Sequence, residues 1–458
     1  MPLRCSPRIT GIGITAAAGA LLALTAPAVS SLGQSFGNGR ALAERASSSR
    51  DLAYALAIQR DGKLVVAGRS ARPWRFALAR YTVGGKLDTS FGRAGKVLTD
   101  VGSQGRSAVS ALAIRRDGKL VVAGWKDVSA LYEIVVVGRY NAGGNLDPSF
   151  GRGGRVVTDF NLGERASAWA RALAIQVDGK LVVAGGRHIV DCGVDCSWRF
   201  ALARYTTNGK LDPSFGRRGK VLTRLGSGVG VAEAAAVAIQ RDGKIVAAGG
   251  GAGYFALARY SASGTLDPTF GTAGRVRTGF GSPGEANGVA IQADGQVVAA
   301  GRTSAGSYDF ALAQYTAEGS LDAGFGSGGK VVTNLGVRDG SKSNDWALAV
   351  ATQGDGKIVV AGSSDARGEP AEKGGYVKDF ALVRYNPDGS LDRSFGSGGK
   401  VLTRFVGNAQ AQAVAIQRDG SIVAAGGGAG YFALARYSAS GTLDPTFGTA
   451  GRVMTRFR

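Results

Sequence analysis

The sequence predicts an all-β protein, a seven-bladed β-propeller of four-stranded antiparallel blades. Three observations support this. A block of strand-like segments recurs seven times in the 458 residues, short apolar runs alternate with turn residues, and no segment keeps a helical period. The turn at the centre of each copy is an Asp-Gly dipeptide, which begins at Asp61, Asp117, Asp178, Asp242, Asp294, Asp355 and Asp419.

The first copy shows the elements that the others repeat. Four runs, residues 53–59, 63–67, 76–81 and 96–99, are rich in Val, Ile, Leu and Phe and are bounded by Gly or Asp, which is typical of strands. We name these predicted strands A, B, C and D. Asp61-Gly62 predicts a two-residue hairpin turn between A and B, because both residue types tolerate positive φ.

The repeat length favours a closed ring. Successive phenylalanines of the Ser-Phe-Gly block and its equivalents, from Phe36 to Phe447, are 52 to 70 residues apart. Four strands in each such unit, repeated seven times, are the pattern of a propeller, in which stacked blades bury both faces of every sheet. An open β-solenoid is the alternative, although its coils are usually shorter and more uniform.

The chain divides into three parts. Residues 1–28 are predicted to be a cleaved signal peptide, with Arg4 and Arg8 before an apolar run and Ala26-Pro27-Ala28 at the cleavage point. Residues 29–50 hold a degenerate copy of the end of the repeat. Residues 51–458 form the propeller, with blades predicted at 51–103, 104–163, 164–228, 229–282, 283–337, 338–407 and 408–458.

The repeat resembles a known family. Its units read Asp-Gly-Lys-x-Val-x-Ala-Gly, then Phe-Ala-Leu-Ala-Arg-Tyr, then Leu-Asp-x-Ser-Phe-Gly, and they are similar to the bacterial delta-60 repeat family. The resemblance implies a β-propeller-like fold and supplies no catalytic residues. The fifth unit departs from the pattern with Gln314 in place of Arg. Residues 236–276 and 413–453 differ only at Lys244 and Ser421, which indicates a duplication.

Charge and cysteine content suggest where the protein acts. The formal charge is +21, and removing the two arginines of the signal peptide leaves about +19, which favours anionic partners or serves solubility alone. We expect a monomer that is secreted, periplasmic or at the cell surface, with no membrane span after cleavage and no cofactor. A disulfide is predicted between Cys192 and Cys196; a metal site with His188 is the weaker alternative, and no metal site is assigned.

Loop lengths separate the two ends of the blades. The A–B turn is always Asp-Gly and the C–D connection has constant length, whereas the B–C and D–A loops vary. In an up-and-down blade these two kinds of connection leave opposite faces, so all variation is predicted on one face, which we call the variable face. Aspartates of the Leu-Asp-x-Ser-Phe-Gly block, such as Asp88, are expected on the other face as turn formers rather than calcium ligands.

Aromatic residues gather in or at the edge of the variable loops. Such rings suit a glycan, an anionic envelope polymer or a protein partner, whereas nucleic acid is not expected as the physiological ligand. The alternative is that the rings cap the ends of the blade cores. The candidate binding residues are Trp74, Trp125, Trp169, Trp198, Trp346, Tyr254, Tyr308 and Tyr431.

Sequence support for catalysis is thin. There is one histidine, no Gly-x-Ser-x-Gly elbow and no phosphate-binding loop before a helix, so no catalytic residue is assigned. We therefore expect a non-catalytic binding or scaffold protein. The alternative is a polysaccharide hydrolase or lyase, for which two carboxylates suffice. Carboxylates are available on the variable face at Asp127, Glu133, Asp191, Asp195, Asp365 and Glu369.

Overall fold

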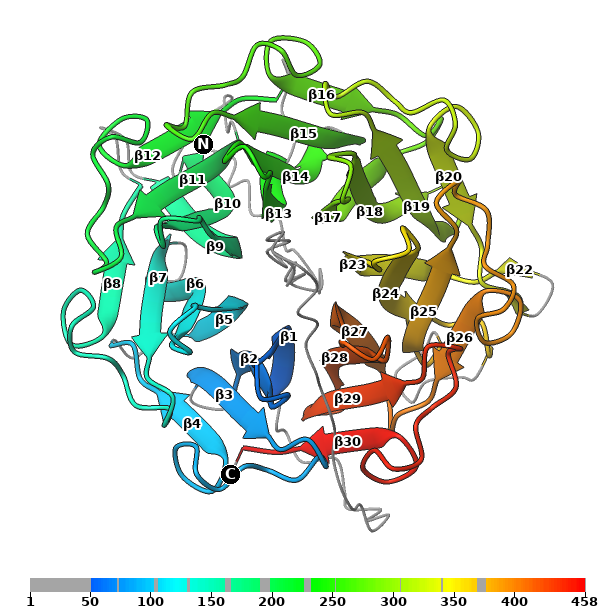
Figure 1. Ribbon diagram of the computed structural model, residues 1–458, viewed down its shortest axis with the longest axis horizontal. Helices are drawn as coiled ribbons and strands as arrows, with labels where there is room; N and C mark the ends of the chain where they lie inside the picture. Colours follow the sequence, from blue (N-terminus) through cyan, green and yellow to red (C-terminus); the bar gives the residue numbers. More distant parts are fainter. Residues whose placement is uncertain are drawn as a thin grey trace, which may run out of the picture.

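The computed structural model describes residues 51–71, 74–102, 106–129, 132–160, 166–189, 198–225, 232–251, 253–304, 306–338, 341–368 and 376–457. Within these ranges seven four-stranded sheets stand around a central axis and no helix is present, as Figure 1 shows. The predicted seven-bladed propeller is confirmed.

Each blade is one antiparallel sheet whose strands follow sequence order from the axis to the rim. The strands are β1 (Leu52–Ile58), β2 (Leu64–Arg69), β3 (Phe76–Tyr81) and β4 (Lys96–Thr99) in blade 1; β5 (Ser107–Ile114), β6 (Leu120–Ser129), β7 (Tyr132–Tyr140) and β8 (Arg155–Thr158) in blade 2; β9 (Ala166–Ile175), β10 (Leu181–Ile189), β11 (Arg199–Tyr205) and β12 (Lys220–Thr223) in blade 3; and β13 (Ala232–Ile239), β14 (Ile245–Gly251), β15 (Tyr254–Tyr260) and β16 (Arg275–Thr278) in blade 4.

The remaining blades repeat this order. Their strands are β17 (Gly284–Ile291), β18 (Val297–Ser304), β19 (Tyr308–Tyr315) and β20 (Lys330–Thr333) in blade 5; β23 (Asp345–Thr352), β24 (Ile358–Ser364), β25 (Asp379–Tyr385) and β26 (Lys400–Thr403) in blade 6; and β27 (Ala409–Ile416), β28 (Ile422–Gly428), β29 (Tyr431–Tyr437) and β30 (Arg452–Thr455) in blade 7. A small hairpin, β21 (Val337–Arg338) and β22 (Ser341–Lys342), lies between blades 5 and 6.

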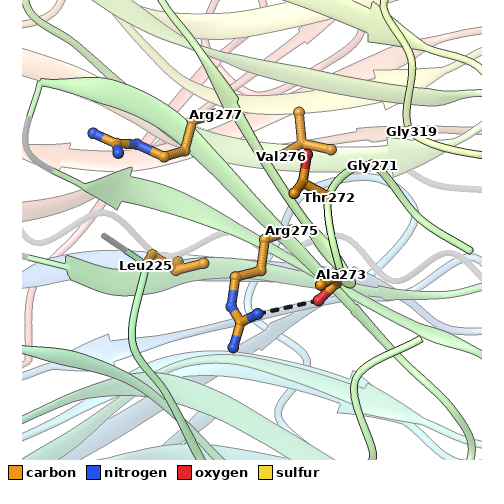
Figure 2. Close-up of a pocket in the computed structure, with 8 residues that line it drawn as sticks. All are labelled: Leu225, Gly271, Thr272, Ala273, Arg275, Val276, Arg277 and Gly319. Carbon is orange, nitrogen blue, oxygen red and sulfur yellow. Dashed lines mark hydrogen bonds between the residues drawn. The ribbon is translucent and has the colours of Figure 1, made fainter. Parts of the chain in front are cut away.

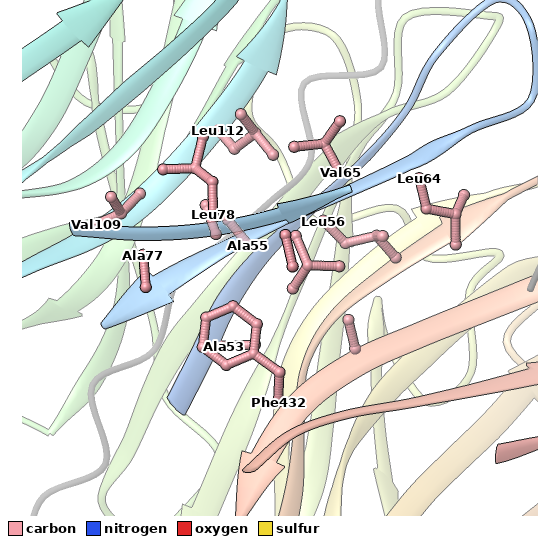
Figure 3. Packing of buried hydrophobic residues seen from close by; sticks show 14 of the residues in the cluster. Ala53, Ala55, Leu56, Leu64, Val65, Ala77, Leu78, Val109, Leu112 and Phe432 are labelled. Atoms are coloured by element: carbon pink, nitrogen blue, oxygen red, sulfur yellow. The ribbon is translucent and has the colours of Figure 1, made fainter. Parts of the chain in front are cut away.

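The core lies between blades. Strands B and C are buried on both faces, and their alanines let neighbouring sheets approach closely. Figure 3 shows one such junction region, where Phe432 of blade 7 lies beside Ala53 of blade 1. Val109 of blade 2 lies next to Ala77 of blade 1 in the same cluster. Because each sheet buries its faces only against its neighbours, one blade has little core of its own.

A hydrogen bond between a tyrosine and a threonine links each blade to the blade before it. The hydroxyl of Tyr140 in β7 donates to Oγ1 of Thr99 in β4 at 2.8 Å. The same bond recurs at 2.7–2.9 Å for Tyr205 with Thr158, Tyr260 with Thr223, Tyr315 with Thr278, Tyr385 with Thr333 and Tyr437 with Thr403. Tyr81 has Thr455 as the corresponding partner, so the series runs across the closure of the ring.

At the closure of the ring, the described residues show no strand exchanged between blades. β1 packs against blade 7, and the last residues of the chain cross back to blade 1. The backbone N–H of Phe457 donates to Asp51 at 2.7 Å, and Nζ of Lys96 donates to the Arg456 carbonyl at 2.7 Å. The Phe457 ring lies 4.7 Å from that of Phe432. β30 thus supplies the outer strand of blade 7.

The face of the Asp-Gly turns is built from repeated ion pairs. In blade 1, Asp88 accepts from Nε of Arg80 at 2.8 Å and from the Ser90 hydroxyl at 2.7 Å, and it pairs with Lys63 at 3.0 Å. The Arg80 guanidinium also donates to a carbonyl of blade 2, that of Ala142. The aspartate oxygens are therefore used by the scaffold, as expected for turn formers.

Several sequence predictions concern residues outside the described ranges. These are the signal peptide and the degenerate repeat within residues 1–50, the Cys192–Cys196 disulfide, and three carboxylates, Asp191, Asp195 and Glu369. In the described part, no helix is long and apolar enough to cross a membrane.

Candidate functional site

Every inner strand carries a β-bulge at the same place. In β5, Val109 pairs with Gly124 and Ala111 with Ala123, so Ser110 has no partner in the register. The equivalent bulge residues of the other inner strands are Tyr54, Arg171, Ala235, Asn287, Leu348 and Gln412. A bulge bends its strand and re-aims a side chain, and bulges are common beside functional sites.

The bulge explains a constant glycine of the repeat. A Cβ on Gly124 would overlap the carbonyl oxygen of Ala108, the residue two before the bulge. The same overlap would occur in every blade, at Gly68, Gly185, Gly249, Gly301, Gly362 and Gly426. None of these glycines needs a positive φ, so the requirement is close approach of backbone to backbone.

Sequence diversity concentrates at two positions of each inner strand. The strands share alanines around the bulge, but the bulge residue and the residue two before it differ from blade to blade. The earlier position holds Leu52, Ala108, Trp169, Glu233, Glu285, Trp346 and Gln410. Reasoning from loop lengths missed these positions; aligning the seven copies column by column would have found them.

The residue two before the bulge packs against strand B of the preceding blade. A Cβ on Gly186 would lie 3.0 Å from Cβ of Glu233, and one on Gly427 would lie 2.7 Å from Cδ2 of Leu52. Large side chains thus face glycines at these junctions. At two others both partners are large: Trp125 clusters with Trp169, and Arg302 stacks on Trp346 at 4.4 Å. These two junctions hold the aromatic clusters.

The larger group, which we call the tryptophan cluster, comprises Trp74, Trp125, Trp169, Trp198 and His188. Trp125 and Trp169 are buried, with 4% and 7% of their surfaces exposed, whereas Trp74 and Trp198 are half-buried. Trp198 stacks on His188 at 4.9 Å and meets Trp169 edge-on at 5.2 Å; Trp74 meets Trp125 edge-on at 6.4 Å. The buried rings hold the two half-exposed rings in place.

Charged groups surround the tryptophan cluster. Nε1 of Trp169 donates to Glu233 at 2.8 Å, and the same carboxylate pairs with Arg171 at 3.0 Å. The guanidinium of Arg69 lies 3.6 Å from the Trp74 ring centre. Burial and the charge of Arg187 lower the pKa of His188, so this ring is neutral at pH 7. The cluster therefore offers aromatic faces beside hydrogen-bonding charges.

Two of the predicted carboxylates lie together. Asp127 and Glu133 are cross-strand partners of β6 and β7. Asp127 forms an ion pair with Arg106 at 2.8 Å. Burial, and next the charge of Asp127, raise the pKa of Glu133 to about 7. Asp365 lies apart, in blade 6, where it accepts from the backbone of Asn344.

A second group, the Trp346 cluster, contains Trp346, Tyr308, Arg302 and Lys378. Tyr308 meets Trp346 edge-on at 5.6 Å, and Nζ of Lys378 lies 3.5 Å from the ring centre. Arg302 also pairs with Glu285 at 2.8 Å. Burial lowers the pKa of Lys378 to about 8, although Asp365 opposes the shift. Cations already cover this tryptophan, so less of its ring is open to a ligand.

The structure revises where some predicted binding residues lie. Trp125, Trp169 and Trp346 are strand residues of β6, β9 and β23 rather than loop residues. Trp74 and Trp198 lie outside the strands. Tyr254 and Tyr431 begin β15 and β29, in the two blades that flank blades 1 to 3 in the ring, and each stacks with an arginine, Arg277 at 4.5 Å and Arg456 at 4.2 Å. Among the described residues, no three His, Cys, Asp or Glu side chains are grouped to hold a metal ion.

Known structures give little guidance on this site. A protein from Lactobacillus plantarum is 14% identical, with a TM-score of 0.48 over 83% of this chain and 94% of its own. A protein of unknown function from Dyadobacter fermentans is 12% identical, with a TM-score of 0.44 over 73% and 95%. The NanB sialidase from Streptococcus pneumoniae is 11% identical, with a TM-score of 0.38 over 88% and 68%. At these values none of them carries an argument about this chain, and no curated protein matches it.

A family model does match, in all seven blades. Its description is "Domain of unknown function (DUF5122) beta-propeller", and it covers residues 59–91, 115–150, 176–215, 240–270, 292–325, 353–395 and 417–447. This confirms a β-propeller repeat family, whereas the delta-60 name stays a resemblance. The matched segments run from the Asp-Gly turn to the Ser-Phe-Gly block, so they leave out the inner strands and with them Trp169. The other four residues of the tryptophan cluster lie within matched segments. The chain belongs to the DUF5122 β-propeller family.

Proposed function

We propose that this protein is an exported, non-catalytic binding propeller that holds a glycan on its variable face, at the tryptophan cluster. The observation that carries the proposal is the arrangement of this cluster. Buried Trp125 and Trp169 fix half-exposed Trp74 and Trp198 at the junctions of blades 1 to 3. Residues held on a rigid scaffold but differing between repeats are typical of binding positions.

The chemistry of the cluster suits sugar rings. An aromatic face packs against the C–H face of a sugar and keeps its own polar tip for hydrogen bonds. Arg106, Arg171 and Glu233 lie beside the rings and can donate to or accept from hydroxyl groups. The mixed signs of these charges favour a polyhydroxylated ligand over a purely anionic one.

Export and monomeric state belong to the same proposal. The N-terminal 28 residues have the pattern of a signal peptide, and the formal charge of about +19 after cleavage suits an anionic cell envelope. An envelope polymer or a protein are the competing ligands. Binding that collapses when salt is added would identify a polyanion held by net charge alone.

A glycan array probed with the mature protein tests the proposal. We expect binding to a defined glycan, reduced at least tenfold by Trp198→Ala and by Trp74→Ala. Trp346→Ala is the matched control, because Lys378 and Arg302 already cover that ring. Unchanged binding in both cluster variants would remove these rings from the site. Binding to no glycan would refute the proposal.

One observation favours a second candidate, a polysaccharide hydrolase or lyase. Cross-strand partners place their Cβ atoms roughly 5 Å apart, and retaining glycosidases need two carboxyl groups at about that separation. Glu133, with its raised pKa, would be the acid, and Asp127 the carboxylate. Release of reducing ends that is lost in Glu133→Gln and Asp127→Asn but kept in Asp365→Asn would support it. No release by the unmodified protein from a polysaccharide panel would exclude it for those substrates.

A further inference from the structure

A pocket of about 520 Å³ opens on the outer side of blade 4, away from the tryptophan cluster. It is lined from three blades: Leu225 follows β12 of blade 3, Arg275 and Arg277 lie on β16 of blade 4, and Gly319 belongs to blade 5. Figure 2 shows the Arg275 side chain between Leu225 and Ala273. This volume is within the range of small-molecule sites.

Blade 4 lacks a contact that most junctions of the scaffold have. At five other junctions the first residue of strand D reaches back to a carbonyl of the preceding blade. Lys96 donates to Arg456, Lys330 to Gly279 and Lys400 to Asn334, at 2.7–3.3 Å. Arg275 instead donates to Ala273 of its own blade at 3.1 Å, so no bridge crosses this junction from it.

A smaller side chain widens the same junction. The residue two after strand D is phenylalanine in blades 2, 4, 6 and 7, where Phe280 and Phe405 pack against Phe255 and Phe380. It is leucine in blade 3, Leu225, and in blade 5, but at the blade 5 junction Lys400 also bridges to the Asn334 carbonyl. Leucine fills less volume than phenylalanine, so space remains beside Arg275.

The lining combines positive charge with apolar surface. In the part of the chain that the structure describes, Arg275 has no carboxylate within ion-pairing distance, and its Nε is buried without a hydrogen-bond partner. The side chain of the neighbouring acid, Glu318, is hydrogen-bonded to Thr316. Arg277 is exposed and stacks on Tyr254. Leu225 and Val276 supply apolar walls, and Gly271 and Gly319 add no side chain to the space.

We propose that this pocket binds a monosaccharide-sized anion, a uronic acid or a sugar phosphate. A guanidinium presents paired N–H donors that match carboxylate and phosphate oxygens, and the apolar walls fit a sugar ring. The pocket is far larger than an inorganic anion requires. This site is separate from the tryptophan cluster and does not depend on the function proposed there.

Blade 7 provides a natural control. Its outer strand repeats that of blade 4 from Gly448 through Arg452 and Val453, but it has Met454 in place of Arg277 and faces Phe405 in place of Leu225. The same arginine is thus present without the second arginine and with the larger wall residue. Of blades 4 and 7, only blade 4 therefore combines two arginines with the smaller leucine wall.

Isothermal titration calorimetry of the mature protein tests the site, with sodium glucuronate, glucose 1-phosphate and neutral glucose as probes at fixed ionic strength. We expect saturable binding of at least one of the two anions, and the stronger of them identifies the source of the charge. Glucose should bind at least tenfold more weakly. Failure of both anions to bind would overturn the proposal.

Variants separate the pocket from general charge. Leu225→Phe fills the space with the residue used at four other junctions, and Arg275→Gln removes the cation, so each should weaken anion binding at least tenfold. Arg452→Gln removes the equivalent cation of blade 7 and should leave it unchanged. Trp198→Ala should also leave it unchanged, which separates this site from the proposed glycan site. Full binding in Leu225→Phe or Arg275→Gln, with native circular dichroism, would refute the assignment.

Discussion

Replacing Gly124 with alanine should damage the scaffold although it adds only one methyl group. The added Cβ would overlap the Ala108 carbonyl oxygen, well inside the 3.0 Å that real Cβ atoms keep from other atoms. That oxygen belongs to the bulge of β5, which pairs with β6 on one side and borders the axis on the other. The two strands must therefore separate by at least about 1 Å at this point.

The cost follows from what the separation breaks. Overpacking of a tight site costs about 1–3 kcal/mol. One or two buried backbone hydrogen bonds beside the bulge are lengthened as well, at about 1–3 kcal/mol. The total is about 2–6 kcal/mol. For a ring of roughly 400 residues the unfolding entropy is about 0.8 kcal/mol per degree, so Tm should fall by about 2–7 °C.

Differential scanning calorimetry of Gly124→Ala and Gly84→Ala measures this effect. Gly84 lies in a turn without positive φ and has no atom within 4 Å of an added Cβ, so its alanine variant should keep or slightly raise Tm. Equal Tm values for the two variants would refute the close-approach explanation of the constant glycine.

Three further predictions concern other parts of the ring. Glu133→Gln should stabilise the protein by about 1–3 kcal/mol above pH 7 and little at pH 4, because a native pKa raised from 4.5 to about 7 makes wild-type stability fall as pH rises through that interval. Urea unfolding at both pH values measures the stability difference between variant and wild type, and a difference that does not change with pH would contradict the prediction. The double variant Gln314→Arg with Gln296→Lys restores the ion pairs of the other blades and should raise Tm by about 1–2 °C. A lower Tm would show that the two glutamines stabilise blade 5 more than the ion pairs do. Phe457→Ala removes the phenyl ring that packs on Phe432 where the propeller closes, and it should lower the free energy of unfolding in urea by about 3 kcal/mol. An unchanged free energy of unfolding would show that the closure does not depend on this phenyl ring.

The repeat made the fold predictable from sequence. Seven copies of a pattern with period-two strands and constant Asp-Gly turns leave few architectures, and constant spacing identified the regular face before any contact was known. The role of Asp88 followed in the same way, since a residue kept in equivalent turns is explained by turn chemistry. Its partners Arg80 and Lys63 were not predicted, because ion pairs across strands require the register.

The candidate site was predicted only in outline. The sequence pointed to the aromatic residues, but burial decides which of them a ligand can reach, and burial depends on the neighbouring blade. Trp125 and Trp169 proved to be supports and Trp74 and Trp198 the accessible rings. Glu233 escaped notice because its importance arises from its contact with Trp169, sixty-four residues earlier in the chain.

Hydrogen–deuterium exchange of the mature protein, with and without the glycan that binds best on the array, tests the central claim most directly. The claim is that ligand binding occurs where the repeat is interrupted, on the variable face over blades 1 to 3. We predict added protection in peptides covering the ends of β6, β7, β9 and β10 and the segment around Trp198, with none at the Asp-Gly turns. Protection at the Asp-Gly turns, or spread evenly over all seven blades, would contradict the account.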